Sequence, residues 1–307
     1  MAAIQRRGLC PDFLNDLHKG HLAALRDRVL QDRSLCLELR ADAINVYYRG
    51  GSVMRVSRAE GDYSAFFDVR YFRDPPPSIH ATLPSRLGTE ADVGRWLDAL
   101  PALKQAMDLW FGDHPKEERE VQQLIVRDNN FGGLARSTDH YVCDIEYANR
   151  HGRFDLVAVR WPSTPSARKK QDGHRLVLGE VKFGDDALEG SAGLHAHIEA
   201  VNAFLAAPGN LAAVKAEMLG VFNQKRRLGL IDCGKDLTGF SDEPPVLLLV
   251  LVNHDPGKSR LRELLVKLPP SPHAELRIAT GSLLGYGLYD PAILMIDEAL
   301  ARFKTCI

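Results

Sequence analysis

Two apolar segments of the chain carry charged side chains: Gly152-Arg153-Phe154-Asp155-Leu156-Val157-Ala158-Val159 and Leu176-Val177-Leu178-Gly179-Glu180-Val181-Lys182-Phe183. Both are short and rich in apolar residues, as expected of strands buried in a sheet. Residues two apart on a strand point to the same face, so Glu180 and Lys182 share a face. If the strands form a hairpin, Asp155 lies close to Glu180. Two carboxylates and one ammonium then meet at one edge of the sheet.

This grouping of charges requires compensation. Two carboxylates about 4 Å apart repel each other by roughly 4 kcal/mol at an effective dielectric constant near 20. A divalent cation turns that repulsion into attraction, and hard oxygen ligands favour Mg²⁺ or Mn²⁺ over zinc. Lys182 would then orient a metal-bound water or stabilise charge that develops on a phosphate. The sequence therefore predicts the groups needed for phosphodiester hydrolysis, with Mg²⁺ (or Mn²⁺) as the cofactor.

Asp155, followed after 25 positions by Glu180-Val181-Lys182, resembles the signature of the PD-(D/E)XK nuclease superfamily, which has the restriction-endonuclease-like fold. The predicted order of elements over residues 114–253 is also similar: a helix, three strands, helices and a buried strand. The resemblance implies that Asp155 and Glu180 bind the metal and that Lys182 assists the attacking water. Phe154 stands where the name of the motif has a proline, a departure that relaxed members share.

The resemblance also implies a further carboxylate near the metal. A family-like acidic residue on the first core helix corresponds to Glu120, or less well to Glu117. A competing interpretation is that these acids simply begin a helix, where they favour the dipole. On the first core strand, Glu146 is a better candidate than Asp144, since this strand should neighbour Asp155.

Two basic clusters are candidates for contacts with the phosphates of a nucleic acid. Arg168-Lys169-Lys170 lies in the loop that joins the two motif strands, and Lys225-Arg226-Arg227 ends a helical segment. The loop leaves from the strand ends opposite Asp155, so it would contact a long duplex rather than the scissile bond. The alternative for both clusters is a solvated surface; at a helix end, cations also favour the dipole.

The other residues of metal-ligand type are predicted to be structural. His195 and His197 are two residues apart in a helical pattern and so point to different sides, which argues against a metal pair and favours exposed histidines. The same prediction covers His140 and His151. Cys143, within a strand, is expected to be a small core residue. The five cysteines are scattered and odd in number, which suits reduced thiols in a cytoplasmic protein.

The composition and the order of elements predict an α/β protein with two domains. The chain has 307 residues, of which 45% are hydrophobic and 26% charged, so it is neither disordered nor too short for one large or two modest domains. Pro75-Pro76-Pro77 breaks a strand-like segment. Residues 1–110 are predicted to form a smaller β-rich α+β domain of unknown role. Residues 111–307 are predicted to form a restriction-endonuclease-like core with a mixed central sheet flanked by helices.

Apolar periodicity and turn residues predict individual elements in both domains. For the first domain they predict helices at 13–31 and 89–108, the second kinked or split by Pro101, and strands at 35–39, 44–48, 53–57 and 65–72, with a Gly50-Gly51 hairpin. For the second domain they predict helices at 116–128, over 187–228 with a break at Pro208-Gly209, and at 293–304. Strands are expected at 141–148, 154–161, 175–183 and 246–252, with edge strands at 276–279 and 283–288.

The charge balance limits the kinds of partner. Lys plus Arg is 39 and Asp plus Glu is 40, so any nucleic-acid site must be a local patch. The longest apolar run, residues 246–252, is far shorter than the roughly 20 residues of a spanning helix, and no membrane partner is expected. Residues 1–10 lack the apolar core of a secretory signal. Among nucleic acids DNA is favoured over RNA, and the first domain is the candidate surface for a second copy of the chain or another protein.

These features together predict a metal-dependent nuclease, namely a Mg²⁺-dependent hydrolase of phosphodiester bonds. One alternative is a non-catalytic module that binds nucleic acid or protein on a nuclease-like scaffold, with arginines occupying the carboxylates. Another is that Asp155, Glu180 and Lys182 form only structural ion pairs. A different phosphotransfer enzyme has no support, because the sequence contains no glycine-rich GxxxxGK[ST] loop.

Overall fold

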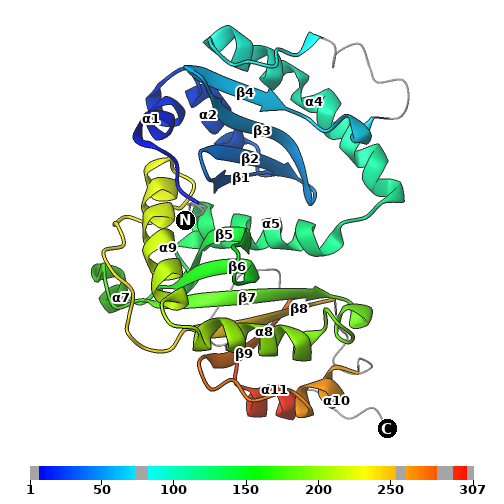
Figure 1. The fold of residues 1–307 in the computed structure, drawn as a ribbon, viewed down its shortest axis with the longest axis vertical. Helices are drawn as coiled ribbons and strands as arrows, with labels where there is room; N and C mark the ends of the chain where they lie inside the picture. Colours follow the sequence, from blue (N-terminus) through cyan, green and yellow to red (C-terminus); the bar gives the residue numbers. More distant parts are fainter. Residues whose placement is uncertain (1–6, 73–81, 254–259, 282–292, 303–307) are drawn as a thin grey trace. The chain divides into compact units, whose positions relative to one another are not determined.

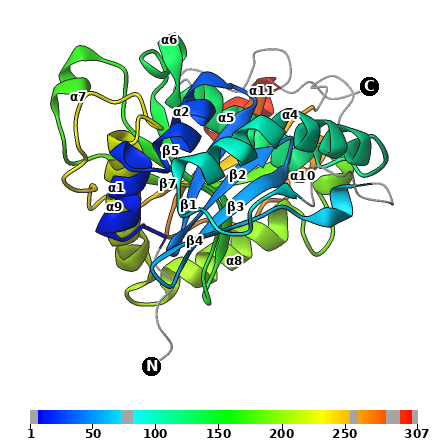
Figure 2. The same cartoon turned by 90° about the horizontal axis from the view of Figure 1, so that it is seen from above.

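The structure is a computed structural model that describes residues 7–72, 82–253, 260–281 and 293–302 of the chain. It is a mixed α/β protein with a four-stranded antiparallel sheet and a six-stranded mixed sheet (Figures 1 and 2). The chain divides into two compact units: unit 1 is Met1–Gln123 with Asn223–Ile231, and unit 2 is Leu124–Phe222 with Asp232–Ile307. Unit 1 therefore extends past the predicted boundary at residue 110 and includes a segment more than a hundred residues downstream of it.

The sheet of unit 1 has its four strands in sequence order. They are β1 (Leu35–Arg40), β2 (Ala43–Tyr48), β3 (Gly51–Ala59) and β4 (Asp62–Phe66). The predicted hairpin is confirmed between β2 and β3, where Arg49 and Gly50 have φ values of 45° and 81°. A Cβ on Gly50 would lie 2.8 Å from the carbonyl oxygen of Lys116, so the turn requires glycine. The strand predicted to reach residue 72 is shorter, because β4 ends at Phe66 and a short 3-10 helix, η1 (Val69–Tyr71), follows.

The helices of unit 1 correct two predictions. The single helix predicted over residues 13–31 is two helices, α1 (Pro11–Lys19) and α2 (Ala23–Gln31). Gly20 between them has extended backbone, and a Cβ there would lie 2.5 Å from the carboxylate of Asp16. Helix α4 (Glu90–Asp113) continues through Pro101 without a break. Leu100 and Leu103 are buried on either side of Pro101, and their packing offsets the hydrogen bond that proline removes.

The sheet of unit 2 has the strand order β10-β9-β8-β7-β6-β5. Its strands are β5 (His140–Ala148), β6 (Arg153–Arg160), β7 (Arg175–Phe183), β8 (Val246–Val252), β9 (Glu275–Gly281) and β10 (Ile293–Leu294). Strands β5, β6 and β7 are antiparallel, whereas β7, β8 and β9 are parallel, and β10 is antiparallel to β9. The predicted mixed sheet is confirmed, but β9 lies inside the sheet, not at its edge. The strand predicted at 283–288 lies outside the described residues.

Most of the helices of unit 2 lie between β7 and β9 in the chain. They are η2 (Asp185–Ala187), α6 (Gly132–Ala135), α7 (Pro165–Lys169), α8 (Leu194–Ala206), α9 (Asn210–Arg227, to residue 222 in this unit), α10 (Leu261–Val266) and α11 (Ile296–Arg302). Helix α5 (Glu117–Asn130) begins in unit 1 and ends in unit 2. The predicted break at Pro208-Gly209 is confirmed, and the last helix begins three residues later than predicted.

Aromatic side chains join the helices of unit 2 to its sheet. Phe154 of β6 packs edge to face on Phe204 of α8, with ring centroids 5.1 Å apart. Trp161, which follows β6, stacks on His174 at 4.0 Å and on Phe222 of α9 at 5.8 Å. These contacts fix α8 and α9 against the strands that carry the predicted motif. In the part of the chain that the structure describes, no helix has both the length and the apolar character to cross a membrane.

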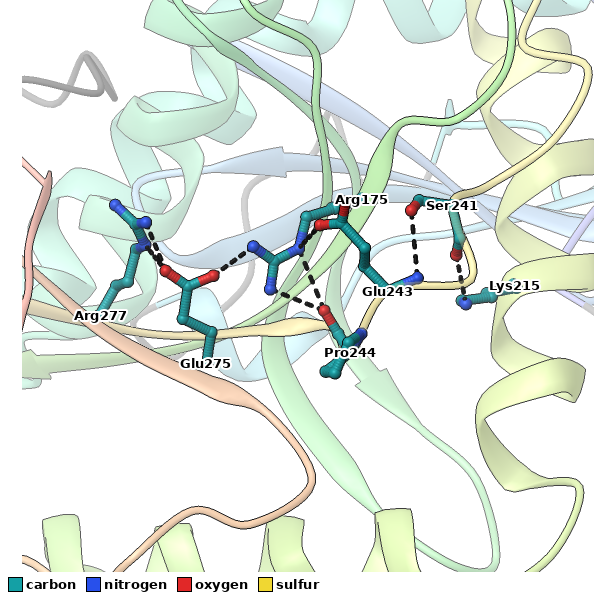
Figure 3. Close-up of polar contacts among 7 residues, drawn as sticks. All are labelled: Arg175, Lys215, Ser241, Glu243, Pro244, Glu275 and Arg277. Carbon is teal, nitrogen blue, oxygen red and sulfur yellow. Dashed lines mark hydrogen bonds and ion pairs between the residues drawn. The ribbon is translucent and has the colours of Figure 1, made fainter.

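An ionic cluster ties together the starts of the three parallel strands (Figure 3). Arg175, the first residue of β7, donates two hydrogen bonds to the carbonyl oxygen of Pro244, at 3.1 and 2.7 Å, and pairs with Glu275, the first residue of β9. Arg277 also pairs with Glu275. Burial raises the pKa of Glu275, but the two guanidinium groups outweigh burial and lower it overall. The cluster thus fixes the amino ends of the strands, and the motif residues lie toward the opposite end of β7.

Candidate functional site

The strand register of unit 2 places three acidic residues in one row. Strands β6 and β7 pair with Leu156 opposite Gly179, and one further step sets Asp155 opposite Glu180. Strand β5 pairs with β6 in a register that sets Glu146 opposite Asp155. Opposite residues of antiparallel strands have Cβ atoms roughly 4.5–5.5 Å apart and share a face. Asp155, Glu180 and Glu146 therefore lie side by side on three adjacent strands.

Strands β6 and β7 approach each other closely next to this row. A Cβ on Gly179 would lie 2.9 Å from the Cβ of Leu156 and 3.5 Å from its carbonyl oxygen. Because these atoms are backbone or close to it, they cannot move aside without moving a strand. Glycine at position 179 therefore sets the spacing of the two strands at the site.

A Gly179→Ala variant should have a free energy of unfolding lower by about 1–3 kcal/mol, as for other overpacked cores. The matched control is Gly220→Ala in α9, where nothing lies within 4 Å of the added Cβ. That variant should be more stable than the parent, by about 0.5–1 kcal/mol, since alanine is the better helix former. Urea denaturation of the three proteins checks both values. Equal stabilities for Gly179→Ala and the parent would contradict the close approach.

Direct contacts join the motif residues. Asp155 Oδ2 accepts a hydrogen bond from the backbone N–H of Val181 at 2.9 Å, which holds this carboxylate against β7. Lys182 Nζ lies 2.8 Å from Glu180 Oε1. His197 Nε2, from α8, lies 2.9 Å from the same oxygen and 3.3 Å from Lys182 Nζ. Asp155, Glu180 and Lys182 are only 5–6% exposed, so the three charged groups are held in a largely dry environment.

The two oxygens of the Glu180 carboxylate have different surroundings. Lys182 and His197 both contact Oε1 of Glu180. The second oxygen, Oε2, has no ion-pair or hydrogen-bond partner among the residues that the structure describes. Glu180 can therefore bind a ligand through Oε2 without losing its protein contacts.

The donor set fits a hard divalent cation held partly by non-protein ligands. Among the described residues, no group of three or more His, Cys, Asp or Glu side chains is spaced to enclose a metal ion. An ion bound by Asp155 and Glu180 would therefore complete its shell with water and substrate oxygens. Mg²⁺ is commonly held in this way, by one or two carboxylates with phosphate oxygens and water. A structural zinc site, which needs four protein ligands, does not fit.

The two additional predicted carboxylates lie in different units. Glu146, opposite Asp155, has a left-handed backbone conformation with φ of 52° and pairs with the exposed Arg153 at 3.1 Å. Glu120 belongs to unit 1, where its carboxylate lies 3.4 Å from Arg49. Of these two carboxylates, only Glu146 lies in the same sheet as Asp155, on the neighbouring strand β5.

In the basic cluster Arg168-Lys169-Lys170, between β6 and β7, the arginine contacts the protein and the two lysines are exposed. Arg168 donates hydrogen bonds to the hydroxyl of Tyr141 and, at 2.5 Å, to the carbonyl oxygen of Thr138, and its guanidinium lies 4.8 Å from the centroid of the Tyr141 ring. It is therefore engaged within the protein. Lys169 and Lys170 are exposed. Only these two of the three remain accessible for a phosphate contact.

The second basic cluster corrects a prediction. Lys225, predicted to contact nucleic acid, is fully buried in unit 1 and pairs with Glu38 of β1 at 2.8 Å. The face of α9 that carries Lys225 turns toward the sheet of unit 1, whereas Arg227 is exposed and Arg226 is half-buried. The helical pattern alone did not reveal that a basic residue faces the core, because its acidic partner lies 187 residues earlier in the chain.

The histidine predictions are corrected in part. His195 is exposed and pairs with Glu199 on its own helix, as an exposed histidine would. His197 is half-buried and contacts both Glu180 and Lys182, so the sequence interpretation missed a residue of the site. The predicted difference in direction between the two histidines was the signal that could have found it. His140, also predicted to be exposed, is buried, because β5 places it inside the sheet.

Gln224, near the end of α9, lies in unit 1. Its side chain accepts a hydrogen bond from the backbone N–H of Leu9 at 2.9 Å and donates one to the carbonyl oxygen of Leu9 at 2.8 Å. Its contacts are therefore those of a residue that anchors the start of the described chain. Cys143 is buried, as predicted for a small core residue.

Asp155 and Glu180 are the residues that would hold a divalent cation, and Lys182 would place an ammonium beside it. A bound cation would make the site more positive and would favour a phosphate group. No protein-family model, no curated protein and no solved structure matches the chain. The chemistry of these side chains is thus the basis on which a function can be assigned.

Proposed function

We propose that the chain is a metal-dependent nuclease of the PD-(D/E)XK type, with a restriction-endonuclease-like core in unit 2, that hydrolyses phosphodiester bonds, with DNA favoured over RNA. The observation that carries the proposal is the buried group of Asp155, Glu180 and Lys182 at the end of paired strands. Acidic side chains are seldom buried, and a buried cluster of them in a fold is a candidate functional site. Here Asp155 and Glu180 each lie one residue beyond the last paired residues of β6 and β7, and Lys182 lies 2.8 Å from Glu180.

Each residue of the group has a role in this proposal. Asp155 and Glu180 hold Mg²⁺ or Mn²⁺, with Glu146 as a further ligand through water. When bound, the ion polarises the phosphoryl oxygen and lowers the pKa of its water. The backbone N–H of Val181 holds the Asp155 carboxylate in place for this task. Lys182 presents its ammonium to the reacting phosphate and stabilises the charge that develops on it.

The order of elements supports the same proposal. Along the chain, α5 is followed by β5, β6 and β7, then by α8 and α9, and then by β8. Strand β8 joins the sheet parallel to β7, next to the strand that carries Glu180 and Lys182. This is the helix, three strands, helices and strand that the sequence resemblance implies. Exposed Lys169 and Lys170 on the connection between β6 and β7 are candidate contacts for a long duplex.

Asp155→Asn is the variant that tests the metal ligand. The parent should cut DNA with Mg²⁺ or Mn²⁺ and stop when a chelator removes the ion. The variant should be at least about 10-fold slower at limiting Mg²⁺, since one anionic ligand becomes neutral. An asparagine oxygen can still accept the hydrogen bond from Val181, so the strands should stay paired. The assay is cleavage of DNA and RNA panels over a Mg²⁺ titration.

The matched control is Asp172→Asn, an aspartate in an exposed turn of the same unit, which should cut like the parent. Equal cleavage by Asp155→Asn and the parent at limiting Mg²⁺ would remove Asp155 from the site. Binding of nucleic acid without cleavage in any divalent metal would favour a non-catalytic module over the nuclease. Cleavage of RNA but not DNA would reverse the substrate preference and leave the chemistry unchanged.

A further inference from the structure

We infer that His197 is a positioning residue that holds the Glu180 carboxylate in place, so that its second oxygen is oriented for the metal. The inference rests on the proposed function and adds to it a residue that the motif does not contain. His197 Nε2 lies 2.9 Å from Glu180 Oε1, within ion-pair distance, and 3.3 Å from Lys182 Nζ.

The helix that carries His197 is fixed against the sheet. Leu194, Ile198 and Val201 of α8 are buried, and Phe204 packs on Phe154 of β6 at 5.1 Å. A Cβ on Gly152, at the start of β6, would lie 2.6 Å from the Phe204 ring, so the helix and the strand are in close contact. The imidazole therefore approaches Glu180 from a rigid element, as a group that positions another side chain must.

The contacts around Glu180 define what His197 can do. The ammonium of Lys182 forms an ion pair with Glu180 Oε1 at 2.8 Å. His197 Nε2 lies 2.9 Å from the same oxygen, and a carboxylate oxygen at that distance requires the ring nitrogen to carry a proton, so the 3.3 Å contact of Nε2 with Lys182 Nζ is then an approach of two donors. Two nitrogen groups from different elements, β7 and α8, then lie within 3 Å of Oε1, and the rotation of the carboxylate is restricted. Oε2 is held in one orientation as a result.

His197 acts through Glu180 in this arrangement rather than as a metal ligand. A ligating nitrogen must present a lone pair, and Nε2 is already committed to Glu180 Oε1. Hydrogen-bond partners of ligating groups commonly affect metal affinity or activity by about 10–100-fold when they are removed. The same helix provides an internal comparison, because His195 is two residues away, exposed and paired with Glu199 at 3.2 Å.

The test uses the full chain as the parent and as His197→Ala, His197→Gln and His195→Ala. Binding of Mn²⁺ is measured by electron paramagnetic resonance of the free ion, without substrate, and single-turnover cleavage is measured over a Mn²⁺ titration. His197→Ala should bind Mn²⁺ about 10-fold more weakly and cleave slowly at low Mn²⁺, with most of the rate recovered at saturating Mn²⁺. His197→Gln should recover the affinity, since its amide N–H can donate to Oε1. His195→Ala should match the parent in both measurements.

Three outcomes would overturn the inference. Unchanged Mn²⁺ affinity in His197→Ala would show that Glu180 needs no positioning by the imidazole, and the proposed function would stand. An equal loss of Mn²⁺ affinity in His197→Gln and His197→Ala would show that an N–H donor at this position is not sufficient, so positioning of Glu180 by such a donor would not be the role of His197. A parent that neither binds Mn²⁺ nor cleaves nucleic acid would overturn the proposed function, and the inference with it. Glutamine is close in size to histidine and the site is half-exposed, so this variant is expected to fold.

Discussion

Replacing Lys182 by alanine should slow single-turnover cleavage by about 10²–10³-fold at saturating metal, equivalent to about 3–4 kcal/mol of lost transition-state stabilisation. The ammonium lies 2.8 Å from Glu180 Oε1 in a site that is largely closed to water, where a fixed positive charge is most effective. Metal binding should persist, because Asp155 and Glu180 remain. The affinity for the metal should even increase slightly, because a positive charge beside the two acids has been removed.

The stability of the same variant separates catalysis from structure. Glu180 keeps the His197 contact at 2.9 Å when Lys182 is removed, so the carboxylate is not left without a donor. The free energy of unfolding should therefore change little. If Lys182 only completes a buried ion pair, its removal should cost about 3–5 kcal/mol. A thermal melt combined with the single-turnover assay decides the question. A large loss of stability with an unchanged rate per folded molecule would refute the catalytic role.

Replacing Lys225 by methionine should lower the free energy of unfolding by about 3–5 kcal/mol. Its Nζ lies 2.8 Å from Glu38 Oε1, and both side chains are at most 1% exposed. Methionine fills the space of the lysine stem but removes the cation that lies 2.8 Å from the buried Glu38 carboxylate. The thiol of Cys36, 3.6 Å from the same oxygen, is a weak donor whose own pKa is raised by burial and by Glu38. Urea denaturation measures the loss.

The double variant Glu38→Leu with Lys225→Met is the control for Lys225. Removing both charges of a buried pair is often neutral or stabilising, so much of the lost stability should return. The cleavage rate per folded molecule should match the parent in both variants. An unchanged stability of Lys225→Met would show that Glu38 is neutral in the folded protein. A lower cleavage rate per folded molecule would show that this pair contributes to the reaction.

The two lysines form a natural comparison, because each lies 2.8 Å from a buried glutamate. Lys225 lies beside Glu38, an acid from a distant part of the chain. Lys182 lies on the same strand as Glu180, with Asp155 on the neighbouring strand and His197 on the next helix. The excess of acid around Lys182, and not the ion pair itself, distinguishes the candidate site from a structural salt bridge.

Local pattern alone predicted much of the secondary structure. Strands β7 and β8 have the predicted bounds, since a short apolar run between polar segments fits only a buried strand. The hairpin at Arg49-Gly50 was found from its turn residues, because a primed turn needs positive φ. The antiparallel pairing of β6 with β7 was also predicted from the sequence, since the two strands are consecutive in the chain.

Only the tertiary structure decided which polar residues meet. The pairing of Lys225 with Glu38, the approach of His197 to Glu180 and the pairing of Glu120 with Arg49 all join residues from different elements. The break at Gly20 likewise depends on how closely the Asp16 side chain approaches it. The spacing of apolar residues along a helix or strand predicts which positions face the core and which face solvent, because side chains on one face recur with the period of the element. The spacing does not predict which side chain from a distant part of the chain lies opposite, since that depends on how whole elements pack against one another.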